Sequence, residues 1–168
     1  DQVSRYSNFM KKYPNAVWTV EESIPLKDGL PTFQIAVTAI KESGPHNYFL
    51  ESKQLVAFQA KDGKIIYQEL ISEQSMLKSS LKPLPITILI PDQVLTGSRY
   101  DVDIVFDEPL GDALVAAGLI NISPEQVKNQ VNPPIALSPM GGGGLFKSVK
   151  APLKEGIQTW AALLAHTD

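Results

Sequence analysis

The chain has 168 residues, 43% of them hydrophobic, which suits one domain or two small ones with a real core. It contains no cysteine, and this excludes disulfides, thiolate nucleophiles and cysteine-based zinc or iron–sulfur sites. The formal net charge is −3 and no segment concentrates basic residues, so we expect no nucleic-acid partner.

No apolar run approaches the roughly 18–20 residues of a membrane-spanning helix, so we expect no membrane span in this chain. The sequence opens at Asp1 rather than at a methionine, and no signal peptide is visible. We therefore expect that an upstream segment has been removed. A secretion signal or a lipid anchor in that segment would make the protein extracytoplasmic.

Residues 2–13 predict a short amphipathic helix, because Val3, Tyr6, Met10 and Tyr13 recur at helical spacing. Four strand-like runs follow the helix, at 16–24, 32–41, 47–60 and 64–75. Asp62-Gly63 separates the last two runs and predicts a tight hairpin turn between them.

Residues 77–85 are rich in serine, lysine and proline and read as a linker. We therefore expect a boundary near residue 80, with domains at 1–80 and 81–168. The second domain should contain strands at 86–90, 99–107, 113–122, 145–149 and 157–165. We expect this domain to be truncated at its C-terminus, because a sandwich would add a further strand.

Ser123-Pro124 predicts the start of a short helix, with Gln126 placed to complete a capping box. Residues 131–144 contain three prolines and four consecutive glycines, so we expect a long loop without regular structure. The lysine that follows the glycines comes after Phe146 rather than after a glycine, which argues against a phosphate-binding loop.

The segment 94–106 leads from an apolar residue through Gly97 to Tyr100, which opens an alternating strand. In that strand Tyr100, Val102 and Ile104 share one face with Phe106. A weaker version of the pattern runs from residue 153 through a glycine to a tryptophan, Trp160. Both segments indicate the corner of a β-sandwich, with Phe146 and Trp160 in its core.

The corner at Tyr100 resembles the tyrosine corner of immunoglobulin-like and fibronectin type III-like β-sandwiches, over about 85–165. The resemblance implies that the tyrosine ring packs in the core and that its hydroxyl bonds the backbone across the corner. It implies no active site, because many unrelated functions share this fold.

The first 80 residues resemble the SnoaL-like, nuclear-transport-factor-2-like group. The resemblance rests on the short helix, on the segment 16–22 after it, and on the long meander around 61–65. It implies an α+β cone with an internal pocket. The fold predicted for the whole chain is thus mainly β, an α+β meander module followed by an immunoglobulin-like sandwich. The alternative is a single seven-stranded sandwich over 16–122 with a C-terminal extension.

Acidic residues are densest between 101 and 112, but their spacing matches no calcium-binding loop, so we expect a solvated strand face and no metal site. The only histidines, His46 and His166, have no partner at a catalytic spacing. We therefore predict no catalytic residue and no cofactor.

A ligand pocket in the first module would use four side chains, Trp18, Tyr48, Tyr67 and Glu69. Aromatic walls with one desolvated acid suit an apolar ligand or a general base. A closed apolar cavity of about 300 Å³ or more between the helix and the meander would support this hypothesis. Core aromatics of a sheet are the simpler interpretation.

The function class that these observations favour is a non-enzymatic binding or assembly module, in a cell envelope if a signal precedes it. We expect a protein partner, bound through exposed sheet edges or the glycine loop. The alternative is small-ligand binding or an isomerase/cyclase-type activity in the pocket of the first module. A purely structural domain of a larger chain is the third possibility.

Overall fold

The computed structural model describes residues 2–79 and 84–167. The chain divides into two compact units, Asp1–Pro83 and Leu84–Asp168. Within the described residues the strands pair antiparallel, which confirms the prediction of a mainly β protein. Each unit is described on its own below.

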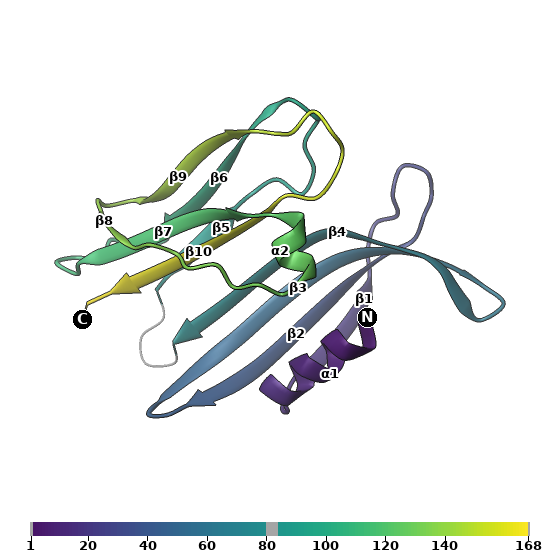
Figure 1. Ribbon diagram of the computed structural model, residues 1–168, viewed down its shortest axis with the longest axis horizontal. Helices are drawn as coiled ribbons and strands as arrows, with labels where there is room; N and C mark the ends of the chain where they lie inside the picture. Colours follow the sequence, from purple (N-terminus) through teal and green to yellow (C-terminus); the bar gives the residue numbers. More distant parts are fainter. Residues whose placement is uncertain (1, 80–83, 168) are drawn as a thin grey trace. The chain divides into compact units, whose positions relative to one another are not determined.

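The first unit is one helix and one four-stranded sheet in the order β1-β2-β3-β4. Its elements are α1 (Gln2–Lys12), β1 (Val17–Glu22), β2 (Thr32–Ser43), β3 (His46–Lys61) and β4 (Lys64–Ser79). Helix α1 lies across one face of this sheet, on the side of β1 and β2 (Figure 1). The contact is aromatic, with the ring centroids of Phe9 and Trp18 5.4 Å apart.

The turn between β3 and β4 forms as the sequence predicts. Asp62 and Gly63 both have positive φ, 52° and 75°, which is the backbone of a type I′ turn. This turn matches the twist of the two strands, and it sets the pairing of Lys61 with Lys64. The register of the long hairpin follows from these two residues.

Strand β4 is longer than the predicted 64–75, because Leu77, Lys78 and Ser79 continue the pairing with β3. The first residues of the expected 77–85 linker are therefore strand. Its central part, residues 80–83, lies outside the described residues. The core of this unit is small: Val37, Ala39, Val56 and Ala57 are its buried hydrophobic side chains among the described residues.

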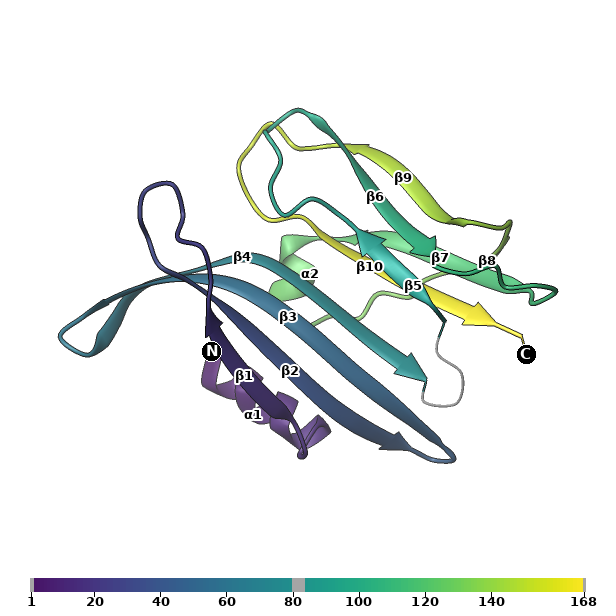
Figure 2. The same ribbon diagram turned by 180° about the vertical axis from the view of Figure 1, so that it is seen from behind.

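The second unit consists of two three-stranded sheets, in the orders β5-β6-β9 and β10-β7-β8 (Figure 2). Its elements are β5 (Ile86–Leu89), β6 (Arg99–Phe106), β7 (Val115–Ile122), α2 (Pro124–Lys128), β8 (Ser138–Met140), β9 (Gly144–Lys150) and β10 (Thr159–His166). Helix α2 begins with the predicted capping box, in which Ser123 and Gln126 exchange side-chain and backbone hydrogen bonds.

The prediction of an irregular loop over 131–144 is wrong at its end, because Ser138–Met140 forms β8 and pairs with β7. The chain before β8 lies so close to Gly118 of β7 that a Cβ there would overlap the Ala136 carbonyl oxygen. The single sandwich over 16–122 does not fit this topology either. Its first four strands form a sheet of their own, and β6 and β7 pair with the later strands β9 and β10.

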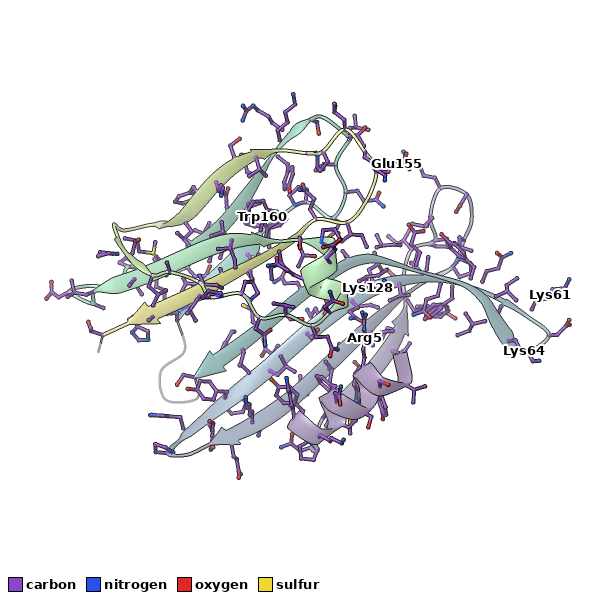
Figure 3. The ribbon with its side chains drawn as sticks, viewed as in Figure 1. Arg5, Lys61, Lys64, Lys128, Glu155 and Trp160 are labelled. Atoms are coloured by element: carbon purple, nitrogen blue, oxygen red, sulfur yellow. The ribbon has the colours of Figure 1, made fainter. Side chains whose placement is uncertain are left out.

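The core of the second unit joins residues of both sheets. Tyr100, Val102 and Ala151 are buried, and Leu119, Val149 and Trp160 pack against them. Trp160 lies between the strands of this unit (Figure 3). Phe146 is not in this core, contrary to the prediction. It is 64% exposed, because the register pairs it with Asp103 on the outer face of its sheet.

Hydrogen bonds tie the corner at Tyr100 to the later segment that resembles it. The Trp160 indole N–H donates to the Tyr100 hydroxyl at 3.0 Å, and that hydroxyl donates to the Gln158 side-chain oxygen. The partners of the tyrosine are thus side chains, whereas the resemblance implied a backbone partner. The Lys147 ammonium lies 5.1 Å from the centroid of the Trp160 ring and covers it at the sheet edge.

Candidate functional site

The predicted pocket residues fall in different places. Trp18 lines a depression of about 230 Å³ between α1 and the sheet. Its apolar side is formed by the end of α1, the residue that follows it and the first three strands; the lining side chains are Phe9, Tyr13, Trp18, Ile35, Val37 and Leu50. This volume is below the roughly 300 Å³ at which ligand pockets begin. The depression is smaller than the cavity that the pocket hypothesis required.

The far side of the same depression is polar, formed by Ser52, Gln54, Glu73 and Ser75 of β3 and β4. The two serine hydroxyls lie 2.7 Å apart, and the Ser75 hydroxyl donates to the Glu73 carboxylate at 3.3 Å. All three side chains are exposed or half-exposed to solvent, so the carboxylate is not desolvated as a general base would be.

Tyr67 and Glu69 line a different depression, with Gln59 and the 28–31 loop. The Tyr67 hydroxyl donates to the Glu69 carboxylate at 2.7 Å, and this hydrogen bond raises the pKa of Tyr67 above its ordinary value of 10.0. Residues alternate along β3, so Gln59 and its partner Tyr67 lie on the face opposite to Gln54. The structure therefore does not bring Trp18 together with Tyr67.

Tyr48 lines neither depression. It is half-buried near the start of β3, where it pairs with Ser79 at the end of β4. The four predicted residues thus form one interacting pair, Tyr67 with Glu69, and two separate aromatics. The exposed fractions of Trp18 and Tyr67, 43% and 44%, also show that neither is a core aromatic.

The most extended open feature of the first unit is the outer edge of β4. This strand pairs with β3 on one side, and no other described strand pairs with it. Over its 16 residues it exposes Ile65 by 61%, Ile66 by 58% and Leu77 by 51%. Unpaired N–H and C=O groups of such an edge can pair with an added strand. The sequence predicts most of this strand, over 64–75, but not its full length or its position at the edge.

Two features of β4 restrict non-specific pairing at this edge. The register with β3 shifts twice, so Ile66 and Ile71 have no partner and form bulges. Lys64 opens the strand and, together with Lys61, projects from the tip of the hairpin (Figure 3). Bulges and lysines are the devices by which proteins keep edge strands from aggregating.

The four glycines do not form an open binding loop throughout. Gly144 belongs to β9, where a Cβ would overlap the Ile104 carbonyl oxygen, and the Phe106 N–H donates to the Gly143 carbonyl at 3.0 Å. Only Gly141 and Gly142 have open space around them. The last two glycines therefore allow a close approach to β6.

The acidic residues between 101 and 112 behave as strand and turn surface. Asp101 is exposed, and Asp107 accepts a hydrogen bond from the Thr87 hydroxyl at 2.6 Å. Within residues 2–79 and 84–167, no three acidic or histidine side chains gather as a metal site would require. His46 is exposed at the start of β3 and His166 ends β10, so the two histidines lie in different units.

None of the helices in the described part of the chain is long and apolar enough to cross a membrane. Residues 81–168 match the family model of a domain of unknown function, DUF8623. Comparison with curated proteins and with solved structures gives no match. The family match covers more than half of the chain and falls on its second unit. The chain therefore belongs to the DUF8623 family.

Proposed function

We propose that this protein is a non-enzymatic binding module that takes up an extended segment of a protein partner along the free edge of β4. The observation that carries the proposal is the unpaired outer edge of a 16-residue strand with exposed isoleucines. In strand addition, main-chain hydrogen bonds supply affinity and alternate side chains supply specificity.

The composition of β4 supports a selective rather than an indiscriminate edge. It holds no proline, so each backbone N–H that points away from β3 can donate to an added strand. The bulges at Ile66 and Ile71 limit pairing with a second flat strand, including another β4. A partner must follow the local twist, which favours a flexible peptide over a preformed sheet.

The other edge of the sheet, β1, is a weaker candidate. It has six residues, and two of them are the adjacent acids Glu21 and Glu22. Charged side chains at the end of a short strand oppose the addition of a further strand. Strand β4 therefore offers the longer and less charged surface.

The alternative of an apolar-ligand or isomerase/cyclase-type pocket has less support. Its cavity is about 230 Å³ and partly polar, and its acid, Glu73, is exposed. The predicted pair of Tyr67 and Glu69 is on the opposite sheet face and equally open. Neither place excludes water from its carboxylate, as catalysis by a general base would need.

We also propose a fold family for each of the two units. The first unit is a SnoaL-like α+β module, supported by the helix that lies across a four-stranded meander. The second unit is an immunoglobulin-like sandwich, supported by two antiparallel sheets that share a core around Tyr100 and Trp160. In both, the fold alone carries no activity.

Selection of peptides from a random library on the full chain tests the proposal. We expect the selected peptides to be extended segments with alternating apolar residues. Ile66→Lys should weaken their binding at least tenfold, because it places a charge on the edge that they occupy. Binding is measured by fluorescence anisotropy of labelled peptides.

Ile24→Lys is the matched control, since Ile24 is 86% exposed and lies outside β4, in the connection between β1 and β2. This substitution should leave peptide binding unchanged. Equal binding by the Ile66→Lys variant and the unmodified chain would contradict the proposal, as would equal losses in the two variants.

A further inference from the structure

The depression beside α1 has a floor made of two neighbouring rows of paired residues that end on β4. The rows consist of Trp18, Val37, Ser52 and Ser75, and of Ile35, Gln54 and Glu73. Both rows change from apolar on β2 to polar on β3 and β4. Exposure rises in the same direction, since Val37 is buried, Ser52 half-buried and Ser75 exposed. The depression is therefore polar and open on the side of β4, the side that α1 leaves uncovered (Figure 1).

The open side of the depression carries a negative charge. Among the described residues that line it, Glu73 is the one charged residue, and none is basic. Lys53 and Lys78 lie close by on β3 and β4, but alternation places both on the opposite face of the sheet. There Lys78 forms an ion pair with Glu51 at 3.7 Å. The lining itself thus supplies no cation for Glu73.

A chain of hydrogen bonds holds the Glu73 carboxylate in place. The Ser75 hydroxyl donates to it at 3.3 Å. The Ser52 hydroxyl lies 2.7 Å from that of Ser75 and therefore donates to it in turn. Both donors are neutral, so they orient the carboxylate without neutralising its charge. A carboxylate held in this way can accept the stronger hydrogen bonds of a charged donor.

A segment added to the outer edge of β4 would extend these rows. Residues 72–79 pair with β3 without a register shift, so this part of the edge is regular. Residues directly opposite each other on paired strands share a face, so the residue opposite Glu73 would lie on the side of α1. The residue opposite Leu77, four positions along, shares that face. Leu77 is 51% exposed and pairs with Leu50, which lines the depression.

We propose that the partner segment carries an arginine or lysine opposite Glu73 and an apolar residue four positions away, opposite Leu77. This inference rests on the proposed pairing of the segment with β4. Opposite charges directly across two strands attract each other, and the apolar stem of a long basic side chain can cover the floor of the depression. An acidic residue at the same position would face Glu73 and be rejected. The edge thus selects partners by the position of one charge.

Peptides selected on the full chain from a random library test this inference. We expect them to share a lysine or arginine four positions from an apolar residue. Replacing that cation by glutamine should weaken binding to the unmodified chain about fivefold, as the loss of a cross-strand charge pair does. The same replacement should have almost no effect on binding to Glu73→Gln, because the charge pair is already lost there. Fluorescence anisotropy of the labelled peptides gives the dissociation constants.

Glu69→Gln is the matched control. It makes the same change on the same strand, but Glu69 pairs with Ala57, which faces the side of β3 opposite to Gln54. In this variant the peptide's cation should keep its full, about fivefold contribution. Selection on Glu73→Lys should instead yield peptides with an acidic residue at that position. Equal loss of the cation's contribution in the Glu69 and Glu73 variants would overturn the inference, because it would show a general attraction to the strand.

The Ile66→Lys variant separates this inference from the proposed function. Peptides that lose binding to Ile66→Lys but share no cation would overturn the inference and leave strand addition standing. Peptides that bind Ile66→Lys as tightly as the unmodified chain, or a selection without binders, would contradict strand addition, and with it the inference.

Discussion

The two units differ in how far their strands bury apolar side chains. In β6 of the second unit, Tyr100 and Val102 are 8% and 0% exposed, within a core that both sheets build. In β1 of the first unit, Val17, Trp18 and Val20 are all more than 40% exposed. One sheet with a single short helix cannot cover both of its faces, whereas two sheets can supply a shared core. The first unit thus exposes apolar side chains along β1, whereas the second buries those of β6 and exposes others, such as Phe146 of β9 and Leu153 of a loop.

We expect the largest loss of stability from a side chain at Gly144, where the structure leaves no room for a Cβ. Gly144→Ala should destabilise the second unit by about 3 kcal/mol, because the new Cβ would overlap the Ile104 carbonyl oxygen and φ there is 147°. Urea denaturation followed by Trp160 fluorescence, in a Trp18→Phe background, reports this unit. Gly142→Ala has open space and should shift stability by less than about 0.5 kcal/mol. Similar losses in both variants would contradict the steric account.

The second largest loss of stability is expected from the difference in burial between Val102 and Val20. Val102→Ala should cost the second unit about 2 kcal/mol, since Val102 is fully buried and its truncation leaves a cavity. The same change at Val20, which is 63% exposed, should cost the first unit less than about 0.5 kcal/mol. Fluorescence of Trp160 follows the unfolding of the second unit and fluorescence of Trp18 that of the first, each with the other tryptophan replaced by phenylalanine. Equal costs would show that the two units are packed alike.

The same substitution, tyrosine to phenylalanine, should affect Tyr100 of the second unit more than Tyr67 of the first. Tyr100→Phe should destabilise by about 1.5 kcal/mol, because it leaves the half-buried Trp160 N–H without its acceptor. Tyr67→Phe removes an exposed hydrogen bond to Glu69 and should leave the stability of the first unit nearly unchanged. Chemical denaturation of both variants makes the test, and a larger loss at Tyr67 would contradict it.

The smallest expected effect is a change in the pKa of Tyr67. Glu69→Gln should lower the pKa of Tyr67 toward 10.0, since the carboxylate acceptor raises it. The contribution of this hydrogen bond to stability is present below the ordinary pKa of tyrosine and is lost as the pH rises through the raised pKa. Ultraviolet absorbance of tyrosinate follows the change. Glu73→Gln is the control, and an unchanged pKa in the Glu69 variant would contradict the assignment.

Local patterns predicted much of the secondary structure. Alternation located the strands, Asp62-Gly63 located the hairpin, and Ser123 with Gln126 located the start of α2. These signals lie within a few residues of one another, so a single sequence contains them. The sequence does not predict β8, because this strand has only three residues and lies in a proline-rich segment without alternating apolar residues. It forms only by pairing with β7.

Long-range register was not predictable in the same way. Phe146 is apolar and lies in a strand, but only its pairing with Asp103 shows that it faces outward. Trp18 is in register with Val37 and, through it, with Ser52 of β3. Tyr67 pairs with Gln59, which faces the opposite side of β3 from Ser52, so the sheet separates Trp18 from Tyr67. The bulges at Ile66 and Ile71 arise from two shifts in the register between β3 and β4. A candidate site chosen by residue type alone could not contain this information.

We propose above that an extended segment pairs with the outer edge of β4. Amide hydrogen exchange of residues 64–79, measured in the full chain with and without a selected peptide, tests it most directly. We expect exchange to slow in alternate amides of this strand when the peptide binds, because only the outward N–H groups gain partners. Slowing confined to other segments, with exchange over 64–79 unchanged, would contradict it.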